Sequence, residues 1–299
     1  MSKTPGHLRT EGGAVADKGA ASPFSFTPKL QMALLGAPII ILIVVVFDYP
    51  IIESVLWSVY DEGTGGLTFA HYQAFWSSEA YGRIIFRTFE IAAKVTLLTV
   101  LVGYPLAYWC TKQTVRVRVI VLGLVVMTFW VSILVRTYAW IVILGSNGLI
   151  NRALKALGVT EDGVAFLYNE TGILIGMTNV LLPFFLLPLY SAMTKVDGRL
   201  IQVAETLGAG PIRRFWSVFF PLTVPALVSS SILIFILSMG FYITPAVLGG
   251  GRIPLVANMM DLLINRFANW EMAAVVAVVL MTVTMILYVA YQWLRERYR

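Results

Sequence analysis

Five side chains in the apolar part of the chain have the types and positions needed to recognise a charged solute. Trp130, Arg136, Tyr138, Trp140 and Tyr242 all occur within long apolar runs. Aromatic faces attract cations, and a charge inside a membrane helix is costly enough that it usually serves a function. We expect these residues to line a solute path, although aromatic residues also serve as packing or interfacial anchors and Arg136 could instead reach the outer interface.

A polar, basic segment between two apolar runs has the pattern of a docking surface for a soluble partner. The segment covers residues 202–225. Gly208 predicts the end of one short helix and Pro211 suits the first turn of a second, so a helix-turn-helix is expected. The residues that we expect to contact the partner are Gln202, Val203, Ala204, Glu205, Leu207, Gly208, Ala209, Arg213 and Arg214.

The sequence holds no motif for catalysis or for a cofactor. A Gly-x4-Gly-Lys-Ser/Thr phosphate loop is missing, so ATP hydrolysis would have to come from another subunit. Gly208 and Gly210 begin a dinucleotide-type pattern, but Arg213 stands where the third glycine belongs. His7 and His71 have no ligands at metal-binding spacing. We therefore expect neither an enzyme nor a metal site in this chain.

The composition indicates a multi-pass membrane protein. Hydrophobic residues make up 58% of the chain and charged residues only 13%, and the mean hydropathy is +0.80. A bilayer core about 30 Å thick needs about 20 apolar residues per helix. Six runs meet this length, at residues 31–52, 84–111, 119–144, 171–194, 222–248 and 272–294. The predicted fold is an all-α membrane protein with six transmembrane helices.

The distribution of charge predicts the orientation of these helices. One set of connections and both ends carry most of the basic residues, namely Lys3, Arg9, Lys18, Lys29, Lys112, Arg116, Arg118, Lys195, Arg199, Arg213, Arg214, Arg295, Arg297 and Arg299. The opposite connections collect Glu53, Asp61, Glu62, Glu79, Glu161, Asp162, Glu170, Asp261 and Glu271. Because cytoplasmic loops are enriched in Lys and Arg, we expect both termini and the 202–225 segment in the cytoplasm. The net charge of +6 follows from this bias and does not indicate nucleic-acid binding.

Two segments outside the predicted spans have patterns of their own. Residues 1–30 lack apolar periodicity and are expected to be a flexible cytoplasmic tail, which leaves 31–299 as the membrane domain. The first apolar run is long enough to stay as an anchor rather than be cleaved as a signal peptide. Residues 145–170 predict an amphipathic outer helix, which could be a ledge for a solute-binding protein or could lie at the lipid interface.

Helix breakers occur inside several predicted spans. They are Pro105, Pro183, Pro188, Pro225, Gly240 and Pro245. Kinks are expected there, and the carbonyls that they free must bond to neighbours or water, so such sites often border a cavity. Proline is also common in membrane helices, so a hinge role is one of two interpretations.

The docking segment resembles the signature loop of permease subunits of ATP-binding-cassette (ABC) importers. That consensus is Glu-Ala-Ala, three residues, Gly, nine residues, Ile, one residue and Leu-Pro. Here the corresponding positions are Gln202-Val203-Ala204, Gly208, Val218 and Phe220-Pro221. The resemblance implies that residues of about 195–221 form a coupling helix that docks in a groove on a cytoplasmic ATPase. Gln202 replaces the usual glutamate and removes a charge at that corner.

Further stretches resemble the spermidine and putrescine importer permeases. They lie at residues 103–107, 129–130, 134–138, 181–184, 188–191, 240–242 and 249–250. This resemblance implies one half of a two-permease pore in the lipid of a bacterial inner membrane, with a second permease subunit, two ATPase subunits that use ATP and Mg, and a periplasmic binding protein. Related permeases carry opines or amino-acid derivatives, and residues 243–248 lack the acid expected in a spermidine permease. The expected solute is a small amine, most simply a polyamine.

An ion-coupled secondary transporter is the competing class. Such a protein would use carboxylates inside the membrane and often has duplicated halves. Glu90 is the only acid well within a predicted span, and Lys94, one turn away, can neutralise it. No duplicated halves are visible. The sequence therefore favours the importer permease.

Overall fold

The computed structural model describes residues 28–63 and 65–297, which divide into two compact units at Glu53. The first unit contains α1 (Pro28–Ile43), the π-helical turn η1 (Val44–Asp48) and the start of α2 (Tyr49–Val59). The tail predicted at residues 1–30 lies, up to residue 27, outside the described residues. Exposed apolar side chains cover the first unit, as expected for a helix that contacts lipid.

The second unit has a short hairpin after the end of α2 and continues as helices. Strands β1 (Tyr60–Asp61) and β2 (Gly66–Leu67) pair antiparallel, with Tyr60 opposite Leu67. The helices up to the docking segment are α3 (Ala70–Ser77), α4 (Glu79–Lys112), α5 (Val115–Met127), the 3₁₀ turn η2 (Thr128–Trp130), α6 (Ile133–Leu144), α7 (Leu149–Ala156) and α8 (Glu170–Met193). The remaining helices are α9 (Gly198–Thr206), α10 (Pro211–Arg214), the π-helical turn η3 (Phe215–Phe219), α11 (Phe220–Met239), α12 (Ile243–Leu248), α13 (Val256–Asn265) and α14 (Trp270–Arg297).

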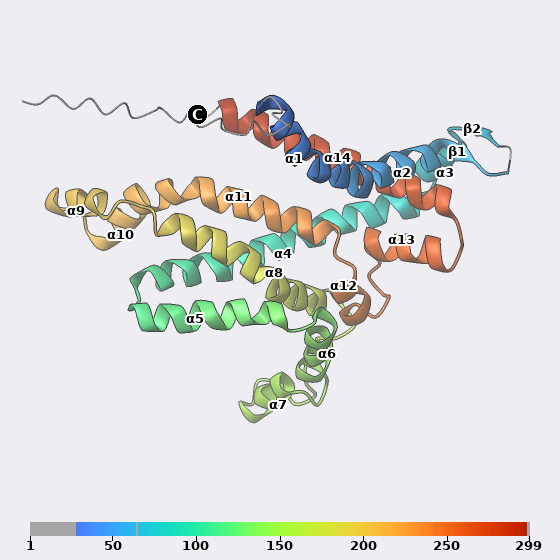
Figure 1. Cartoon of the computed structure of the whole chain (residues 1–299). Coiled ribbons are helices and arrows are strands. Elements are labelled where there is room, and N and C mark those ends of the chain that lie inside the picture. Colours follow the sequence, from blue (N-terminus) through green and yellow to red (C-terminus); the bar gives the residue numbers. More distant parts are fainter. Residues whose placement is uncertain (1–27, 64, 298–299) are drawn as a thin grey trace, which may run out of the picture. The chain divides into compact units, whose positions relative to one another are not determined.

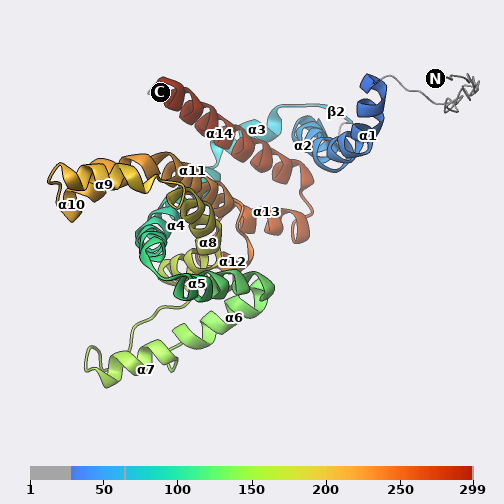
Figure 2. The same cartoon turned by 60° about the vertical axis from the view of Figure 1, so that its left-hand side comes forward.

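The main core of the second unit lies between α4, α8 and α11, which pack pairwise (Figures 1 and 2). Ile91, Met177, Phe185 and Ile234 are fully buried in it. Gly103 allows α4 to approach α8, because a Cβ there would lie 2.5 Å from Cδ1 of Phe185. Small residues at such contacts let membrane helices pack closely.

A second apolar cluster joins α3, α13 and α14. Phe75 of α3 is buried against these helices, and its ring stacks on Tyr81 with centroids 5.3 Å apart. Val256 and Met259 of α13 face Val276 of α14 across this cluster. The packing fixes the position of the short helix α13 against α14.

The expectation of an all-α membrane protein is confirmed. Among the described residues, five stretches are long and apolar enough to cross a membrane: Leu35–Val59, Ile133–Ala156, Glu170–Met193, Pro211–Met239 and Trp270–Val289. Helix α4 contains the remaining predicted span and has 34 residues, which is about 50 Å at 1.5 Å per residue. The count of six spans stays a prediction.

Two predicted spans are each broken in the structure. The helix expected over 119–144 stops in η2, and α6 begins anew at Ile133. The helix expected over 222–248 ends at Met239, and α12 begins at Ile243. By contrast, α4, α8 and α11 continue through their internal prolines. The second break begins at Gly240, one of the predicted helix breakers, whereas the first break, after η2, contains neither proline nor glycine.

Candidate functional site

The docking segment folds as the predicted helix-turn-helix. Helix α9 ends in a Schellman motif, in which the Ala209 amide donates to the Ala204 carbonyl at 3.0 Å and the Gly208 amide to the Glu205 carbonyl at 2.9 Å. Gly208 has a φ of +81°, a conformation that favours glycine. Pro211 then opens α10. The sequence signals for the turn thus have a direct structural basis.

The outer surface of this segment is apolar at its turn. Leu207 is 82% exposed and Ile212 is 75% exposed, with Val203 exposed beside them. A contiguous exposed apolar patch usually marks an interaction site. The other predicted contact residues divide by exposure: Gln202, Glu205, Gly208 and Arg213 are exposed, whereas Ala204, Ala209 and Arg214 are half-buried. Leu207 therefore presents itself to a partner more fully than Ala204 does.

An aromatic cluster connects the docking segment to the end of α4. The ring of Phe215, at the start of η3, lies edge-on to Tyr108 with centroids 5.0 Å apart. Tyr108 also contacts Phe219 at 5.1 Å. Beside them, the hydroxyls of Tyr104 and Thr223 lie 2.9 Å apart. The sequence analysis missed this cluster, although Phe215 and Phe219, four residues apart, share a helix face.

Arg136 supports the break between α5 and α6. Its Nη2 donates to the carbonyls of Thr128 and Val131, the latter at 3.1 Å. The Thr128 carbonyl also accepts from the Val131 amide at 3.3 Å, so the guanidinium adds a second donor there and supplies one to Val131. The contact links the end of η2 to α6 across the break. The predicted path residue Arg136 thus bonds to backbone within the described part of the chain.

The other four predicted path residues lie on the two broken spans. Trp130 is 81% exposed, and Tyr138 and Tyr242 are also exposed, whereas Trp140 is half-buried with its Nε1 3.3 Å from Oδ1 of Asn179. Helices α6 and α12, the second halves of the two spans, pack against each other. The structure therefore brings the two breaks into one region of the second unit.

Tyr242 belongs to a polar cluster that the sequence analysis did not foresee. Its hydroxyl donates to Oδ2 of Asp261 at 3.1 Å, and its carbonyl accepts from Nδ2 of Asn258 at 3.2 Å. Nδ2 of Asn265 donates to Oδ1 of Asp261 at 2.7 Å. The three α13 residues are spaced three and four apart, so they share one face of that helix. This spacing was the available signal.

A four-residue ionic cluster joins α4 to the start of α8. Glu90 accepts from Arg87 and from Lys94, each at 2.6 Å. Glu170 accepts from the same two cations, each at 2.5 Å. The predicted Glu90–Lys94 pair is present, and Glu170 and Arg87 complete a closed ring of alternating charges. Because Arg87 and Lys94 neutralise the charge of Glu90, this carboxylate fits a structural role better than a role in ion-coupled transport.

The docking segment and the broken spans lie within a region that matches a known family. Residues 99–299 match the family described as "Binding-protein-dependent transport system inner membrane component". The chain belongs to this family. It is thus a permease subunit of an ABC importer and a multi-pass inner-membrane protein, and the family consists of transport components rather than enzymes.

Relatives of this permease agree with the family assignment. The chain is 34% identical to "Spermidine/putrescine transport system permease protein PotB" of Haemophilus influenzae, over 71% of this chain and 74% of that protein. It is 29% identical to the PotB of Escherichia coli, over 73% of this chain and 78% of that protein. It is 28% identical to "Inner membrane ABC transporter permease protein YdcU" of Escherichia coli, over 71% of each chain.

Solved structures share the fold of the permease. A bacterial ABC transporter involved in the import of the acidic polysaccharide alginate matches with a TM-score of 0.64 and 18% identity, over 90% of this chain and 96% of that chain. The same kind of transporter, in complex with an alginate pentasaccharide-bound periplasmic protein, matches with a TM-score of 0.68 and 18% identity, over 90% of this chain and 95% of that chain.

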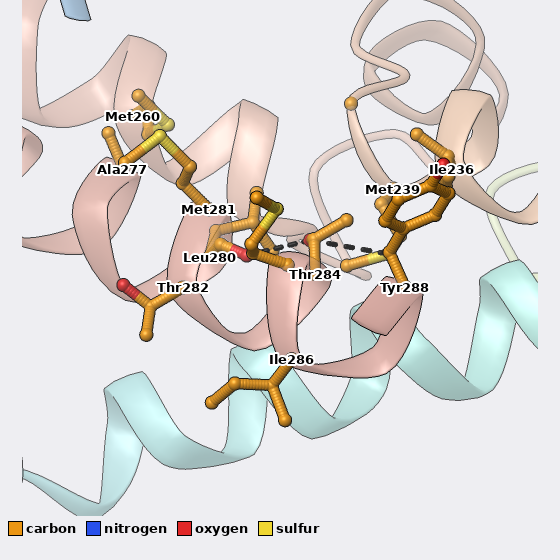
Figure 3. A pocket seen from close by; sticks show the side chains of 12 residues that line it. Ile236, Met239, Met260, Ala277, Leu280, Met281, Thr282, Thr284, Ile286 and Tyr288 are labelled. Carbon is orange, nitrogen blue, oxygen red and sulfur yellow. Dashed lines mark hydrogen bonds between the residues drawn. The ribbon is translucent and has the colours of Figure 1, made fainter. Parts of the chain in front are cut away.

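The permease also contains an apolar pocket of about 740 Å³ between α11, α13 and α14 (Figure 3). Met239, Met260, Met281 and Met285 contribute to its lining, and Thr284 bonds there to the Leu280 carbonyl at 2.7 Å. Such a lining does not suit a charged solute. Within residues 28–63 and 65–297, no group of three His, Cys, Asp or Glu side chains could hold a metal ion.

Proposed function

We propose that this permease forms one half of a pore that imports a small amine solute, most simply a polyamine. The observation that carries the coupling part of the proposal is the exposed apolar patch of Val203, Leu207 and Ile212 on the helix-turn-helix. The solute class is supported by the names of the relatives, since PotB proteins are spermidine/putrescine permeases. An opine or amino-acid derivative is the second candidate, because residues 243–248 carry no acid.

In this proposal the other subunits supply energy and solute. A second permease completes the pore, two ATPase subunits bind ATP and Mg, and a periplasmic protein delivers the solute. Six spans with both termini in the cytoplasm would place α9 and α10 on the ATPase side, in line with the positive charge there. The residues proposed for coupling are Gln202, Val203, Ala204, Glu205, Leu207, Gly208, Ala209, Arg213 and Arg214.

The proposed transport cycle is alternating access, and the connections of α9 and α10 to the rest of the chain support it. When the ATPases close on ATP, the docking patch moves with them and the pore opens outward; hydrolysis resets it. Movement of α10 reaches α11 directly through η3, and it reaches α4 through the ring contacts of Phe215 and Phe219 with Tyr108. A π-helical turn at this junction fits a functional site, where such turns are frequent.

The test uses the complete transporter in proteoliposomes with labelled putrescine and spermidine. Gly208→Arg is compared with Gly65→Arg, because both glycines have positive φ (+81° and +67°) and a Cβ at either position would have no described atom within 4 Å. Only Gly208→Arg should lose uptake and solute-stimulated ATP hydrolysis. Normal uptake by Gly208→Arg at matched membrane level would overturn the coupling role. Stimulated ATP hydrolysis without polyamine uptake in the unchanged permease would redirect the solute search to opines.

A further inference from the structure

We propose that Asp261 and Tyr242, together with Asn258, bind a protonated amine of the solute during its passage. The inference rests on the proposed function and adds the chemical group that is recognised and the side chains that recognise it. It assigns the acidic contact to α13, because residues 243–248, where an acid was expected, have none.

The Asp261 carboxylate has bonding capacity left for a solute. It accepts from Tyr242 at 3.1 Å through Oδ2 and from Asn265 at 2.7 Å through Oδ1. An ionised carboxylate offers about four lone-pair sites, so these two bonds leave room for further donors. An ammonium group has three such donors and no acceptor.

Only uncharged side chains of the described residues donate hydrogen bonds to the Asp261 carboxylate. In the described part of the chain, Asp261 takes part in no ion pair. A partly buried carboxylate gains from a cation that approaches it, because the surroundings screen the attraction less than water does. The site therefore favours a positively charged ligand over a neutral or anionic one.

Asn258 adds an acceptor that lacks a partner. Its Nδ2 donates to the Tyr242 carbonyl, which fixes the orientation of the amide. Its Oδ1 is buried and has no hydrogen-bond partner among the described residues. A buried polar atom without a partner is costly and usually marks a missing water, ion or ligand. Asn258 and Asp261 share a helix face, so in this proposal the Asn258 amide turns its oxygen toward an ammonium group held by Asp261.

The position of Tyr242 makes the site reachable. It follows Gly240 and Phe241 in the break between α11 and α12, and its side chain is 40% exposed. Non-helical backbone at membrane depth is tolerated where it is buried in protein or lines a water-filled cavity. Because Tyr242 is exposed in this chain, its ring face is open to a cation in the proposed pore.

The decisive experiment measures initial uptake of labelled putrescine and spermidine against concentration, using the complete transporter in proteoliposomes. Asp261→Asn should raise KM about tenfold or more, the loss expected for one charge-assisted hydrogen bond. Maximal ATP hydrolysis stimulated by the binding protein should stay close to that of the unchanged transporter. Glu62→Gln, which alters an exposed acid in the connection between β1 and β2, should leave KM unchanged.

Two further variants separate amine binding from simple support of Tyr242. Tyr242→Phe removes the hydroxyl but keeps the ring, so its KM should rise much less than that of Asp261→Asn. If the two variants matched, Asp261 would serve only to hold the tyrosine and the proposal would fail. Asn258→Ala should raise KM several-fold without affecting the carboxylate, and an unchanged KM in it would remove Asn258 from the site.

The remaining outcomes also decide between the two proposals. An unchanged KM in Asp261→Asn, or an equal loss in Asp261→Glu, which retains the charge, overturns the amine site. Uptake of neither cation by the unchanged transporter overturns it as well. In that case ATP hydrolysis stimulated by the binding protein would still support the importer function, and its absence would overturn that function too.

Discussion

Arg214 forms an ion pair with Glu205, with Nη1 and Oε2 2.7 Å apart, and thereby joins α10 to α9 across the turn. Because the Glu205 side chain is 61% exposed, the pair contributes little to stability, about 1 kcal/mol at most. Its role is to hold the two short helices as one body. We therefore expect Arg214→Glu to reduce coupled uptake several-fold at normal membrane levels. The double variant Glu205→Arg with Arg214→Glu should recover most of it, and a double variant no better than the single one would argue against this role.

The side chains tolerated at position 208 are expected to be limited by its backbone conformation rather than by lack of space within the chain. Gly208 has a φ of +81°, and no described atom lies within 4 Å of a Cβ placed there. A β-branched residue in this conformation costs roughly 1–2 kcal/mol, whereas asparagine adopts it more readily. Gly208→Asn should therefore retain more uptake than Gly208→Val. The measurement is uptake at matched membrane level, and equal activity of the two variants would contradict the explanation.

The sequence was sufficient for features that depend on local pattern. Gly208 and Pro211 predicted the turn and the start of α10 because each has a conformational preference independent of its surroundings. The length of the apolar run predicted both ends of α8 closely, at 171–194 against Glu170–Met193. A helix surrounded by lipid and a helix surrounded by protein both need apolar side chains along their length. The amphipathic helix predicted within residues 145–170 is present as α7, and its outer location stays a prediction.

The rest depended on contacts between distant residues. Across the break before Ile133, the Arg136 side chain reaches carbonyls of the preceding turn, which no helix signal encodes. Asp261 was assigned to an outer connection because its charge was considered alone, and its contact with Tyr242 arises from the packing of α13 on α14. Glu170 was likewise assigned to a connection, although it completes an ionic cluster with Arg87 and Lys94.

Removing the Arg136 guanidinium should destabilise the break between α5 and α6. Arg136→Ala removes the guanidinium donor from the carbonyls of Thr128 and Val131, and a lost hydrogen bond of this kind costs about 1 kcal/mol. We expect a lower midpoint of thermal unfolding in detergent and faster proteolysis near Ser132. The unfolding midpoint of Arg136→Lys should lie between those of Arg136→Ala and the unchanged permease, because lysine keeps the charge and some donors. An unchanged midpoint in Arg136→Ala would show that other groups hold the break.

The ionic cluster should depend on Glu170 more than on other outer acids. Glu170 is the only member contributed by α8, and it accepts from both Arg87 and Lys94. Glu170→Gln leaves an excess positive charge on α4 and weakens its attachment to α8. Thermal unfolding should begin at lower temperature than in Glu161→Gln, which alters an exposed acid of the same outer segment. Added salt should narrow the difference by screening the cluster.

The contact of Gly103 with Phe185 should tolerate added volume poorly. A Cβ at Gly103 would lie 2.5 Å from Cδ1 and 2.8 Å from Cε1 of the Phe185 ring, which is fully buried and cannot move aside. Gly103→Ala should therefore lower thermal stability, since overpacking costs about 1–3 kcal/mol. The matched control is Gly123→Ala in α5, where no described atom lies within 4 Å of the new methyl group. That variant should be neutral or stabilising, because alanine favours the helix. Adding Phe185→Leu to Gly103→Ala should restore part of the loss, and a further decrease instead would show that the clash is not its cause.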